Sequence, residues 1–353
     1  MVTVRVPAKV NVQLGVGGVR PDGYHDLANV FFAVALGDQV TATPGTGVTL
    51  SCEGPDAGAV PLDDGNLAAR AARLLAAHHG LADPGVHLHI DKAIPVAGGM
   101  AGGSADGAAA HLAAALRASG TCRTAHAAPG DPPHIPTRLP VAVGVAGARG
   151  AGPAALLACD ALWGLDTPLP ALLELAAELG SDVPFALLGG VALGRGRGEL
   201  LEPLPVAGTF HWVFAVADGG LSTPAVYREC DRLREEAGLG SSAADVPDPD
   251  ADPALLAALA EGDPVALAAA LANDLQAAAV SLRPSLADTL HAGTEAGALA
   301  ALVSGSGPTC AFLAKDADAA AHIAAALRAS GTCRTAHATH GPVPGAQVVH
   351  TSA

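Results

Sequence analysis

Hydrophobic and polar residues alternate at the start of the chain in the pattern of a β-hairpin. Residues 2–16 alternate and are rich in valine, residues 20–23 read Arg-Pro-Asp-Gly, and residues 30–36 form an apolar run. A period of two is typical of a strand with one buried face, and proline, aspartate and glycine favour turns. The pattern therefore predicts two strands joined by a turn at residues 20–23.

The next part of the chain alternates between helical and extended patterns. Small and apolar residues recur at helical spacing over residues 66–77, directly after the turn signal Asp-Asp-Gly. Residues 86–90 alternate as a strand, and a glycine-rich run begins at Pro95. This order predicts a strand, a glycine loop and a helix.

The second half of the chain repeats the mixture of helices and strands. Its periodicity predicts helices over residues 171–179, 253–271 and 317–328, and strands over residues 190–193, 212–217 and 300–303. Both halves are therefore expected to be α/β, and 353 residues are enough for two domains of ordinary size.

One short stretch of the sequence occurs twice. Residues 108–127 and residues 319–338 are identical except that Leu112 in the first copy is Ile323 in the second. Structural repeats diverge in sequence but keep their hydrophobic pattern, so a recent duplication or an error in the sequence explains this pair better than a repeat architecture. The proline- and glycine-rich sequence that follows lacks periodicity, and we interpret residues 111–155 as an insertion within a helix.

The composition argues against several classes of protein. A formal net charge of −15 disfavours a nucleic-acid-binding surface, which needs clustered lysine and arginine. The N-terminus lacks the apolar segment of a signal peptide, and no apolar run is long enough for a membrane span, so a cytoplasmic protein is expected. The six cysteines show neither disulfide nor metal-site spacing and are expected to be reduced.

The strongest chemical signal is the glycine-rich run. Glycine lets backbone N–H groups approach a ligand closely, and the start of a helix adds unsatisfied donors and partial positive charge. Phosphate suits such a site, although the run matches neither the phosphate loop of nucleoside triphosphatases nor the dinucleotide-binding glycine pattern. Taken alone, a glycine-rich turn is equally consistent with a purely structural role. The run comprises Pro95, Val96, Ala97, Gly98, Gly99, Met100, Ala101, Gly102, Gly103, Ser104 and Ala105.

Three segments occur in the order found in a known kinase family. Residues 7–11 read Pro-Ala-Lys-Val-Asn, residues 95–105 form the glycine-rich run, and residues 303–310 read Val-Ser-Gly-Ser-Gly-Pro-Thr-Cys. These segments resemble motifs 1, 2 and 3 of the GHMP kinases, and the resemblance implies that residues 95–105 wrap the ATP phosphates. The resemblance covers nearly the whole chain apart from residues 111–155.

This resemblance implies the family's two-domain α/β fold and its ATP-dependent chemistry. An N-terminal ATP-binding domain, like that of a small-subunit ribosomal protein, is expected over residues 1–205, and a ferredoxin-like domain over residues 206–353. ATP and a small-molecule substrate are expected in the cleft between them. Mg²⁺ is expected to arrive with ATP rather than to sit in a cage of protein ligands.

The resemblance also implies two catalytic residues. Residues 180–184 read Gly-Ser-Asp-Val-Pro and resemble the segment whose carboxylate, Asp182 here, acts as general base, while Lys9 resembles the motif 1 lysine that stabilises charge. Phosphoryl transfer needs a group that orients or deprotonates the attacking hydroxyl, together with positive charge on the phosphates. The alternative is that Asp182 only caps a helix or forms a turn.

Residues 20–27, which read Arg-Pro-Asp-Gly-Tyr-His-Asp-Leu, resemble the diphosphocytidyl-methylerythritol kinases more than the homoserine, mevalonate or galactose kinases. Tyr24 can stack on a flat base and His25 can hydrogen-bond its edge, as selection of a cytosine headgroup requires. The resemblance implies a substrate that carries a cytidine diphosphate headgroup and is phosphorylated at its 2-hydroxyl. The alternative is that both side chains only pack on the turn.

Five further residues are weaker candidates. Asn11 is expected to hydrogen-bond the substrate, and Gly305 and Ser306 are expected to line its site. Asn66 resembles a family position near the adenine, although a helix cap is equally consistent. Lys92 could reach a phosphate or the adenine, or it could lie in solvent at a strand end.

Two other functions remain compatible with the sequence. One is another GHMP small-molecule kinase, of the homoserine or mevalonate type. The other is a nucleotide-binding protein that the insertion at residues 111–155 has inactivated. In each case no nucleic-acid or membrane partner is expected, and the protein is expected to be a monomer or a homodimer.

Overall fold

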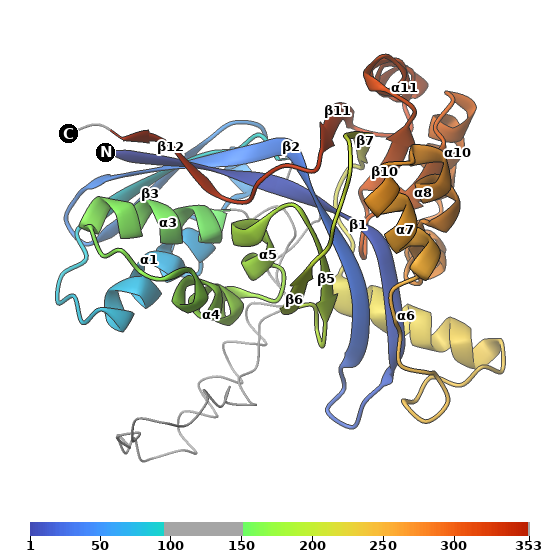
Figure 1. Ribbon diagram of the computed structural model, residues 1–353, viewed down its shortest axis with the longest axis horizontal. Coiled ribbons are helices and arrows are strands. Elements are labelled where there is room, and N and C mark those ends of the chain that lie inside the picture. Colours follow the sequence, from blue (N-terminus) through green and yellow to red (C-terminus); the bar gives the residue numbers. More distant parts are fainter. Residues whose placement is uncertain (95–150, 352–353) are drawn as a thin grey trace.

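Two β-sheets form the framework of the fold, and helices pack against each of them (Figure 1). The computed structural model describes residues 1–94 and 151–351. The larger, eight-stranded sheet consists of β1 (Val2–Val19), β2 (His25–Pro44), β3 (Val48–Glu53), β4 (Val86–Asp91), β5 (Val191–Arg195), β6 (Leu200–Pro203), β8 (Ala272–Asn273) and β12 (Gln347–Thr351). Its order is β12-β1-β2-β4-β3, with β5 paired to β2 and β6, and β8 paired to β1.

The smaller sheet lies in the C-terminal half and is antiparallel. Its four strands are ordered β11-β7-β10-β9 and comprise β7 (Phe210–Val216), β9 (Ala300–Val303), β10 (Cys310–Ala314) and β11 (Thr335–Gly341). The helices of this half are α6 (Thr223–Glu236), α7 (Pro253–Glu261), α8 (Pro264–Ala270), α9 (Gln276–Leu282), α10 (Ser285–Glu295) and α11 (Ala317–Ser330). Among the described residues, every helix is too short or too polar to cross a lipid bilayer.

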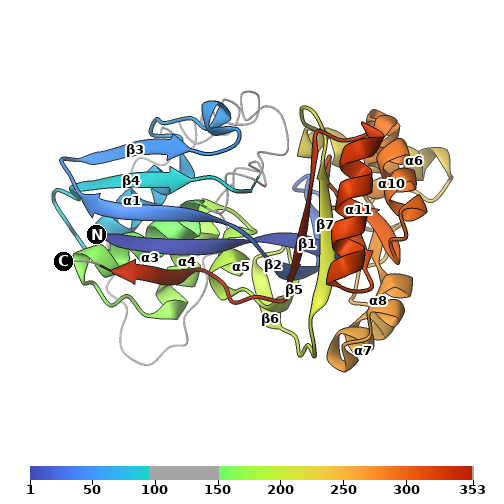
Figure 2. The same ribbon diagram turned by 90° about the horizontal axis from the view of Figure 1, so that it is seen from above.

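The helices of the N-terminal half cover one face of the larger sheet (Figure 2). They are α1 (Leu67–His78), α3 (Ala151–Trp163), α4 (Leu169–Leu179) and α5 (Val183–Leu188), and a short 3-10 turn, η1, spans Ala57–Ala59. Leu75 of α1 and Leu156 of α3 are buried in one core with Leu88 of β4. The alternation of apolar residues along the strands therefore produces the buried face that the sequence predicts.

The predicted hairpin is confirmed and is longer than expected. β1 and β2 pair antiparallel from Val2 to Val19. Arg20 N donates to Tyr24 O at 2.7 Å and closes the turn, where Gly23 has a φ of 81°, a conformation that glycine adopts at little cost. The turn residues identified in the sequence therefore place the hairpin tip correctly.

The hairpin contributes side chains to the cores of both halves. Val4 and Val40 pack in the core beneath the larger sheet. Further along the same strands, Val12 and Phe32 pack with Trp212 of β7 in the core of the C-terminal half. One pair of strands therefore joins the two halves through buried apolar contacts.

The helix predicted over residues 253–271 is wrong, because the chain forms two helices there. Gly262 ends α7 with a left-handed φ of 73°. Asp263 then caps α8, since its Oδ1 accepts from Val265 N at 2.8 Å and from Ala266 N at 3.1 Å. Glycine at a helix end followed by a capping aspartate overrides the continuous apolar pattern.

The insertion at residues 111–155 stays a prediction, but its last five residues are helical rather than irregular. Residues 111–150 lie outside the described residues. Residues 151–155 form the first turns of α3, and Ala151, Ala154 and Ala155 are buried in the core of the N-terminal half. Because these alanines pack against the fold, α3 begins before the position that the sequence indicated.

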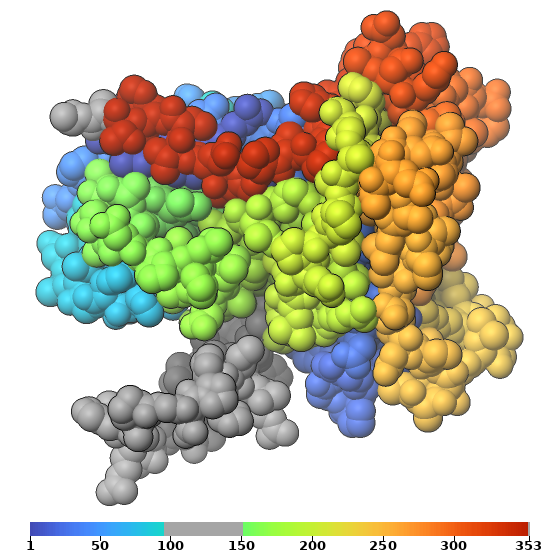
Figure 3. Space-filling model, in the orientation of Figure 1, coloured from blue at the N-terminus to red at the C-terminus, as the bar shows by residue number. Residues whose placement is uncertain are grey.

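The domain boundary at residue 205 stays a prediction. Strand β12, near the C-terminus, pairs antiparallel with β1, and β8 pairs with β1 in parallel. Figure 3 shows the C-terminal segment, in red, running from the C-terminal half onto the N-terminal half. The chain after residue 205 therefore also contributes strands to the larger sheet.

A buried ion pair holds the end of β4, just before the glycine-rich run. Lys92 Nζ donates to Asp38 Oδ2 at 2.5 Å, and the two side chains are 1% and 0% exposed. Asp38 Oδ1 also accepts from Ala93 N at 2.9 Å and from Ile94 N at 2.8 Å. Burial raises the pKa of Asp38, whereas Lys92 and these two N–H groups oppose the rise. Lys92, which the sequence left open, is a buried structural residue.

Replacing Lys92 with methionine is expected to lower the free energy of unfolding by about 3–5 kcal/mol, because Asp38 then keeps a buried charge without its partner. Lys315 is exposed, so Lys315→Met provides a matched control with an expected change within about 0.5 kcal/mol. Urea unfolding at neutral pH measures both variants. Equal losses in the two would contradict the structural role of Lys92.

The pH dependence of this loss has a defined sign. A carboxyl group whose pKa is raised by folding destabilises the native state above its unfolded pKa, and this cost disappears as the pH falls through the native pKa. Without Lys92 the pKa of Asp38 rises further. The stability difference between Lys92→Met and the wild type should therefore shrink on acidification, and a difference that grows would contradict this account.

Candidate active site

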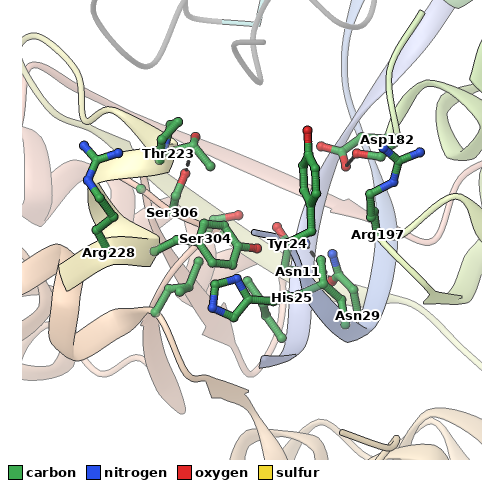
Figure 4. A pocket seen from close by; sticks show the side chains of 18 of the residues that line it. Asn11, Tyr24, His25, Asn29, Asp182, Arg197, Thr223, Arg228, Ser304 and Ser306 are labelled. Atoms are coloured by element: carbon green, nitrogen blue, oxygen red, sulfur yellow. Dashed lines mark hydrogen bonds between the residues drawn. The ribbon is translucent and has the colours of Figure 1, made fainter. Parts of the chain in front are cut away.

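A cavity of about 480 Å³ lies where the two halves meet. Its walls come from both hairpin strands, the start of α5, the first turns of α6 and the loop over residues 304–307 (Figure 4). The residues singled out in the sequence that line it are Lys9, Asn11, Tyr24, His25, Asp182, Gly305 and Ser306. Folding thus brings together motif 1, the hairpin tip, the Asp-Val-Pro segment and motif 3.

Lys9 and Asp182 lie close together in the wall of the cavity. Lys9 Nζ is 3.9 Å from Asp182 Oδ2, and the side chains are 22% and 19% exposed. Lys9 Nζ also donates to Asn11 Oδ1 at 2.5 Å, and Asn11 Nδ2 donates to Asn29 Oδ1 at 2.7 Å. Asn11 is thus fixed with its oxygen toward the ammonium group, which also lies 5.5 Å from the ring centre of Phe31.

Asp182 precedes α5, but its side chain does not cap that helix. The residue occupies the N-cap position with a φ of −90° and makes no side-chain capping hydrogen bond. Ser181 Oγ donates to Asp182 Oδ1 at 3.3 Å. The alternative that the Asp182 side chain only caps a helix is therefore wrong. Its carboxylate faces the cavity instead (Figure 4).

The loop over residues 304–307 approaches Asn11 closely. Gly305 has a φ of 58°, and a Cβ atom there would lie 3.1 Å from Asn11 Oδ1. Asn273 holds the loop backbone, because its Nδ2 donates to the carbonyl oxygens of Val303 at 2.6 Å and of Gly305 at 2.8 Å. A glycine is required here both by backbone conformation and by the space that Asn11 occupies.

The hairpin tip and α6 form a further part of the cavity wall. His25 Nε2 lies 3.0 Å from Asp231 Oδ1, and the His25 ring packs against Tyr227 with the ring centres 5.1 Å apart. The guanidinium carbon of Arg197 lies 5.6 Å from the ring centre of Tyr24. The contacts of His25 and Tyr24 therefore extend beyond the turn on which they stand, and both side chains line the cavity.

Two predicted parts of the ATP site stay predictions. The glycine-rich residues 95–105 lie outside the described residues, so their contact with phosphate stays a prediction. Asn66 caps α1, with its Oδ1 accepting from Ala68 N at 2.8 Å and its Nδ2 donating to Pro61 O at 2.6 Å. The structure thus shows the capping role, and a contact with adenine stays a prediction.

Sequence reasoning missed several residues that line the cavity. Tyr227 had one usable signal, since it is one of only two tyrosines in the chain. The others belong to no recognisable motif, and only the fold brings them to the cavity. The missed residues are Asn29, Arg197, Tyr227, Arg228 and Asp231.

Comparison with known proteins decides the family. A model of the GHMP kinases N terminal domain matches residues 66–128, and a model of the GHMP kinases C terminal region matches residues 255–333. The 4-diphosphocytidyl-2-C-methyl-D-erythritol kinase of Streptomyces avermitilis is 60% identical over 348 residues, which cover 99% of each chain. The chain belongs to the GHMP kinase family. It is therefore a kinase, and the family implies ATP as the phosphoryl donor.

Other relatives of this GHMP kinase agree. The kinase of the same name from Thermobifida fusca is 56% identical over 356 residues, covering 99% of this chain and 98% of the relative. A crystal structure of a 4-(cytidine 5'-diphospho)-2C-methyl-D-erythritol kinase shares 30% identity with a TM-score of 0.66 and covers 96% and 99% of the two chains.

A homoserine kinase from Cytophaga hutchinsonii is only 19% identical, with a TM-score of 0.64 and coverage of 99% and 97%. At this identity the similarity shows the fold alone. The family and the α/β fold predicted from the sequence are therefore confirmed.

Replacing Gly305 with alanine is expected to lower the turnover of this kinase about 10- to 100-fold, because the new methyl group displaces Asn11 and with it Lys9. Gly297 also has a positive φ, of 93°, but nothing lies within 4 Å of the position a Cβ would take. Gly297→Ala is thus a matched control, because it introduces a similar backbone strain of about 1 kcal/mol. Its turnover is expected to be unchanged. Coupled ADP-release kinetics separates the two outcomes, and equal turnover in both variants would show that Gly305 does not position Asn11.

Proposed function

We propose that this kinase transfers the γ-phosphoryl group of ATP to the 2-hydroxyl of 4-diphosphocytidyl-2-C-methyl-D-erythritol, a step in the non-mevalonate route to isoprenoid precursors. The observation that carries the proposal is that one cavity is lined both by aromatic and hydrogen-bonding groups and by Lys9 and Asp182. The names of relatives that are up to 60% identical support the choice of substrate.

The cytosine base is placed at the hairpin tip. Tyr24 and, from the neighbouring helix α6, Tyr227 supply aromatic rings to the cavity wall, and His25 supplies a ring nitrogen. A nucleobase is flat and carries hydrogen-bonding groups on its edge, so it requires a stacking surface together with polar groups in its plane. The tip provides both.

The diphosphate is assigned to the arginines that line the cavity. Arg197 and Arg228 line the cavity in a chain whose formal net charge is −15. Guanidinium groups present several N–H donors in a plane that matches phosphate oxygens. These two arginines are therefore assigned to the diphosphate of the substrate.

Asp182 and Lys9 are assigned to the reacting hydroxyl. The Asp182 carboxylate accepts the hydroxyl proton as the oxygen attacks phosphorus, and the Lys9 ammonium stabilises the negative charge that develops. Asn11 holds the ammonium in place through its hydrogen bond at 2.5 Å. A fixed carboxylate and a fixed cation on the same hydroxyl are the groups that phosphoryl transfer needs from the protein.

ATP is assigned to the glycine-rich residues 95–105, with Asn66 near the adenine. Mg²⁺ prefers phosphate and carboxylate oxygens and keeps several waters, so we place it on the ATP phosphates. Bound there, it would neutralise part of the phosphate charge. Lys9, which lines the cavity, adds positive charge from the protein side.

Replacing Asp182 with asparagine is expected to lower kcat about 10²- to 10⁴-fold, because the amide cannot accept the hydroxyl proton. The fold should persist, since the Asp182 side chain makes no capping hydrogen bond. Asp64, whose side chain is 89% exposed, gives the control Asp64→Asn with unchanged kcat. Near-normal turnover in Asp182→Asn would remove this residue from the role of general base.

Replacing Tyr24 with leucine is expected to raise KM for the cytidine-bearing substrate about tenfold or more, because a base–aromatic stacking contact contributes about 1–3 kcal/mol. Tyr24→Phe keeps the ring and should keep most of the affinity. Steady-state kinetics of the two variants against the wild type measures the effect. Similar KM values for both would place the base elsewhere.

A substrate panel tests the proposed reaction against its alternatives. Wild-type protein is expected to release ADP with the cytidine-bearing diphosphate and not with homoserine or mevalonate. Activity on either of the last two would favour another branch of the family. ATP binding without turnover of any of the three would favour the inactive nucleotide-binding protein.

A further inference from the structure

Near His25, which is proposed to contact the cytosine base, the cavity contains a carboxylate that the proposed reaction does not use. Asp231 lies on α6, and its Oδ1 is 3.0 Å from Nε2 of His25, across 206 positions of sequence. The side chains are 21% and 7% exposed, respectively. A largely buried hydrogen bond between such distant residues fixes one edge of the imidazole ring.

The same helix also fixes the plane of the ring. Tyr227 lies four residues before Asp231, so the two side chains lie on one face of α6. The ring centres of Tyr227 and His25 are 5.1 Å apart, with an angle of 32° between the planes. His25 is therefore held by its edge and by its face, and its orientation is determined by α6 rather than by the hairpin alone.

The chemistry of the partner determines where the imidazole carries its hydrogen. An ionised carboxylate can only accept hydrogen bonds, so Nε2 must donate to Asp231. In the neutral ring Nδ1 is then left with a lone pair. Within residues 1–94 and 151–351, Nδ1 of His25 has no hydrogen-bonding partner. It is not fully buried, and His25 lines the cavity. Nδ1 is therefore reached from the cavity.

A lone pair at this position distinguishes two closely related bases. Cytosine carries an amino group at C4, which donates hydrogen bonds, whereas uracil carries an oxygen there, which accepts them. If uracil is bound, its oxygen and Nδ1 of His25 are both acceptors and cannot hydrogen-bond to each other. Leaving both groups without a partner costs about 1–3 kcal/mol. This corresponds to discrimination of about 10- to 100-fold.

We propose that Asp231 is a positioning residue that holds His25 in the tautomer with hydrogen on Nε2, so that Nδ1 accepts a hydrogen bond from the cytosine amino group and uracil is rejected. The inference rests on the proposed function, because it assumes that a cytosine base occupies the cavity beside His25. Asp231 itself does not touch the base; it acts through His25.

The first test compares two substrates in four proteins. The specificity ratio is kcat/KM for the cytidine-bearing substrate divided by kcat/KM for its uridine-bearing analogue. Asp231→Ala removes the acceptor for Nε2, so the imidazole can exchange tautomers, and the ratio should fall about tenfold or more. Asp231→Asn retains an acceptor oxygen and should lie between Asp231→Ala and the wild type. Glu235→Ala, one turn further along α6 and exposed, should leave the ratio unchanged.

The second test reads the tautomer without any substrate. Two-bond proton–nitrogen correlation spectra of ¹⁵N-histidine-labelled protein distinguish a ring nitrogen that carries hydrogen from one that does not. His25 is assigned by the signal that disappears in His25→Gln. We expect hydrogen on Nε2 in the wild type and a mixture of tautomers in Asp231→Ala. A wild-type spectrum with hydrogen on Nδ1 would overturn the inference.

Failure of the proposed function and failure of the role of Asp231 give different results. Wild-type protein that does not phosphorylate the cytidine-bearing substrate overturns the proposed function and the specificity role together. Wild-type protein that is active on it, combined with an unchanged ratio in Asp231→Ala, overturns only the role of Asp231. A purely structural role would lower stability and both kcat/KM values equally, which also leaves the ratio unchanged and counts against the proposal.

Discussion

Burial of one long hairpin in two hydrophobic cores is the constraint on which the rest of this structure depends. Val4 of β1 packs beneath the larger sheet, whereas Val12 of the same strand packs against the smaller one. Between them, Lys9 and Asn11 line the cavity. Because alternate strand residues point to opposite faces, a shift of one residue would bury Lys9 and expose valine. The core thus enforces the position of the lysine that lies beside Asp182.

The chain uses its few lysines in specific places. Its formal net charge is −15, and only three residues are lysine. Lys92 is buried against Asp38 at the end of β4, and Lys9 lies between Asp182 and Asn11 in the cavity. The cavity also contains Arg197 and Arg228, so it presents positive charges to a ligand although the chain as a whole is acidic.

The local sequence pattern was sufficient to predict those parts of the fold and the site that depend on consecutive residues. The hairpin, its turn and the position of Asp182 before α5 follow from strand alternation, turn residues and a short motif. The break at Gly262 was also visible in the sequence, but the apolar periodicity on both sides obscured it. The family resemblance, rather than periodicity, supplied the roles of Lys9 and Asp182.

The remaining site residues could not be predicted because their positions depend on contacts between distant segments. Asp231 and Tyr227 belong to an amphipathic helix without a motif, and only the packing of α6 against the hairpin tip brings them to His25. Asn29 looks like an ordinary polar strand residue until the pairing of β1 and β2 places it within 2.7 Å of Asn11. Such pairs require the tertiary structure.

The central claim is that one cavity binds the cytosine base at the hairpin tip and the reacting hydroxyl at Asp182. A crystal structure with the cytidine-bearing substrate and a non-hydrolysable ATP analogue measures this directly. The account predicts the base against Tyr24 and the 2-hydroxyl oxygen about 2.6–3.2 Å from a carboxylate oxygen of Asp182. A base bound away from Tyr24, or a 2-hydroxyl far from the Asp182 carboxylate, would contradict the account.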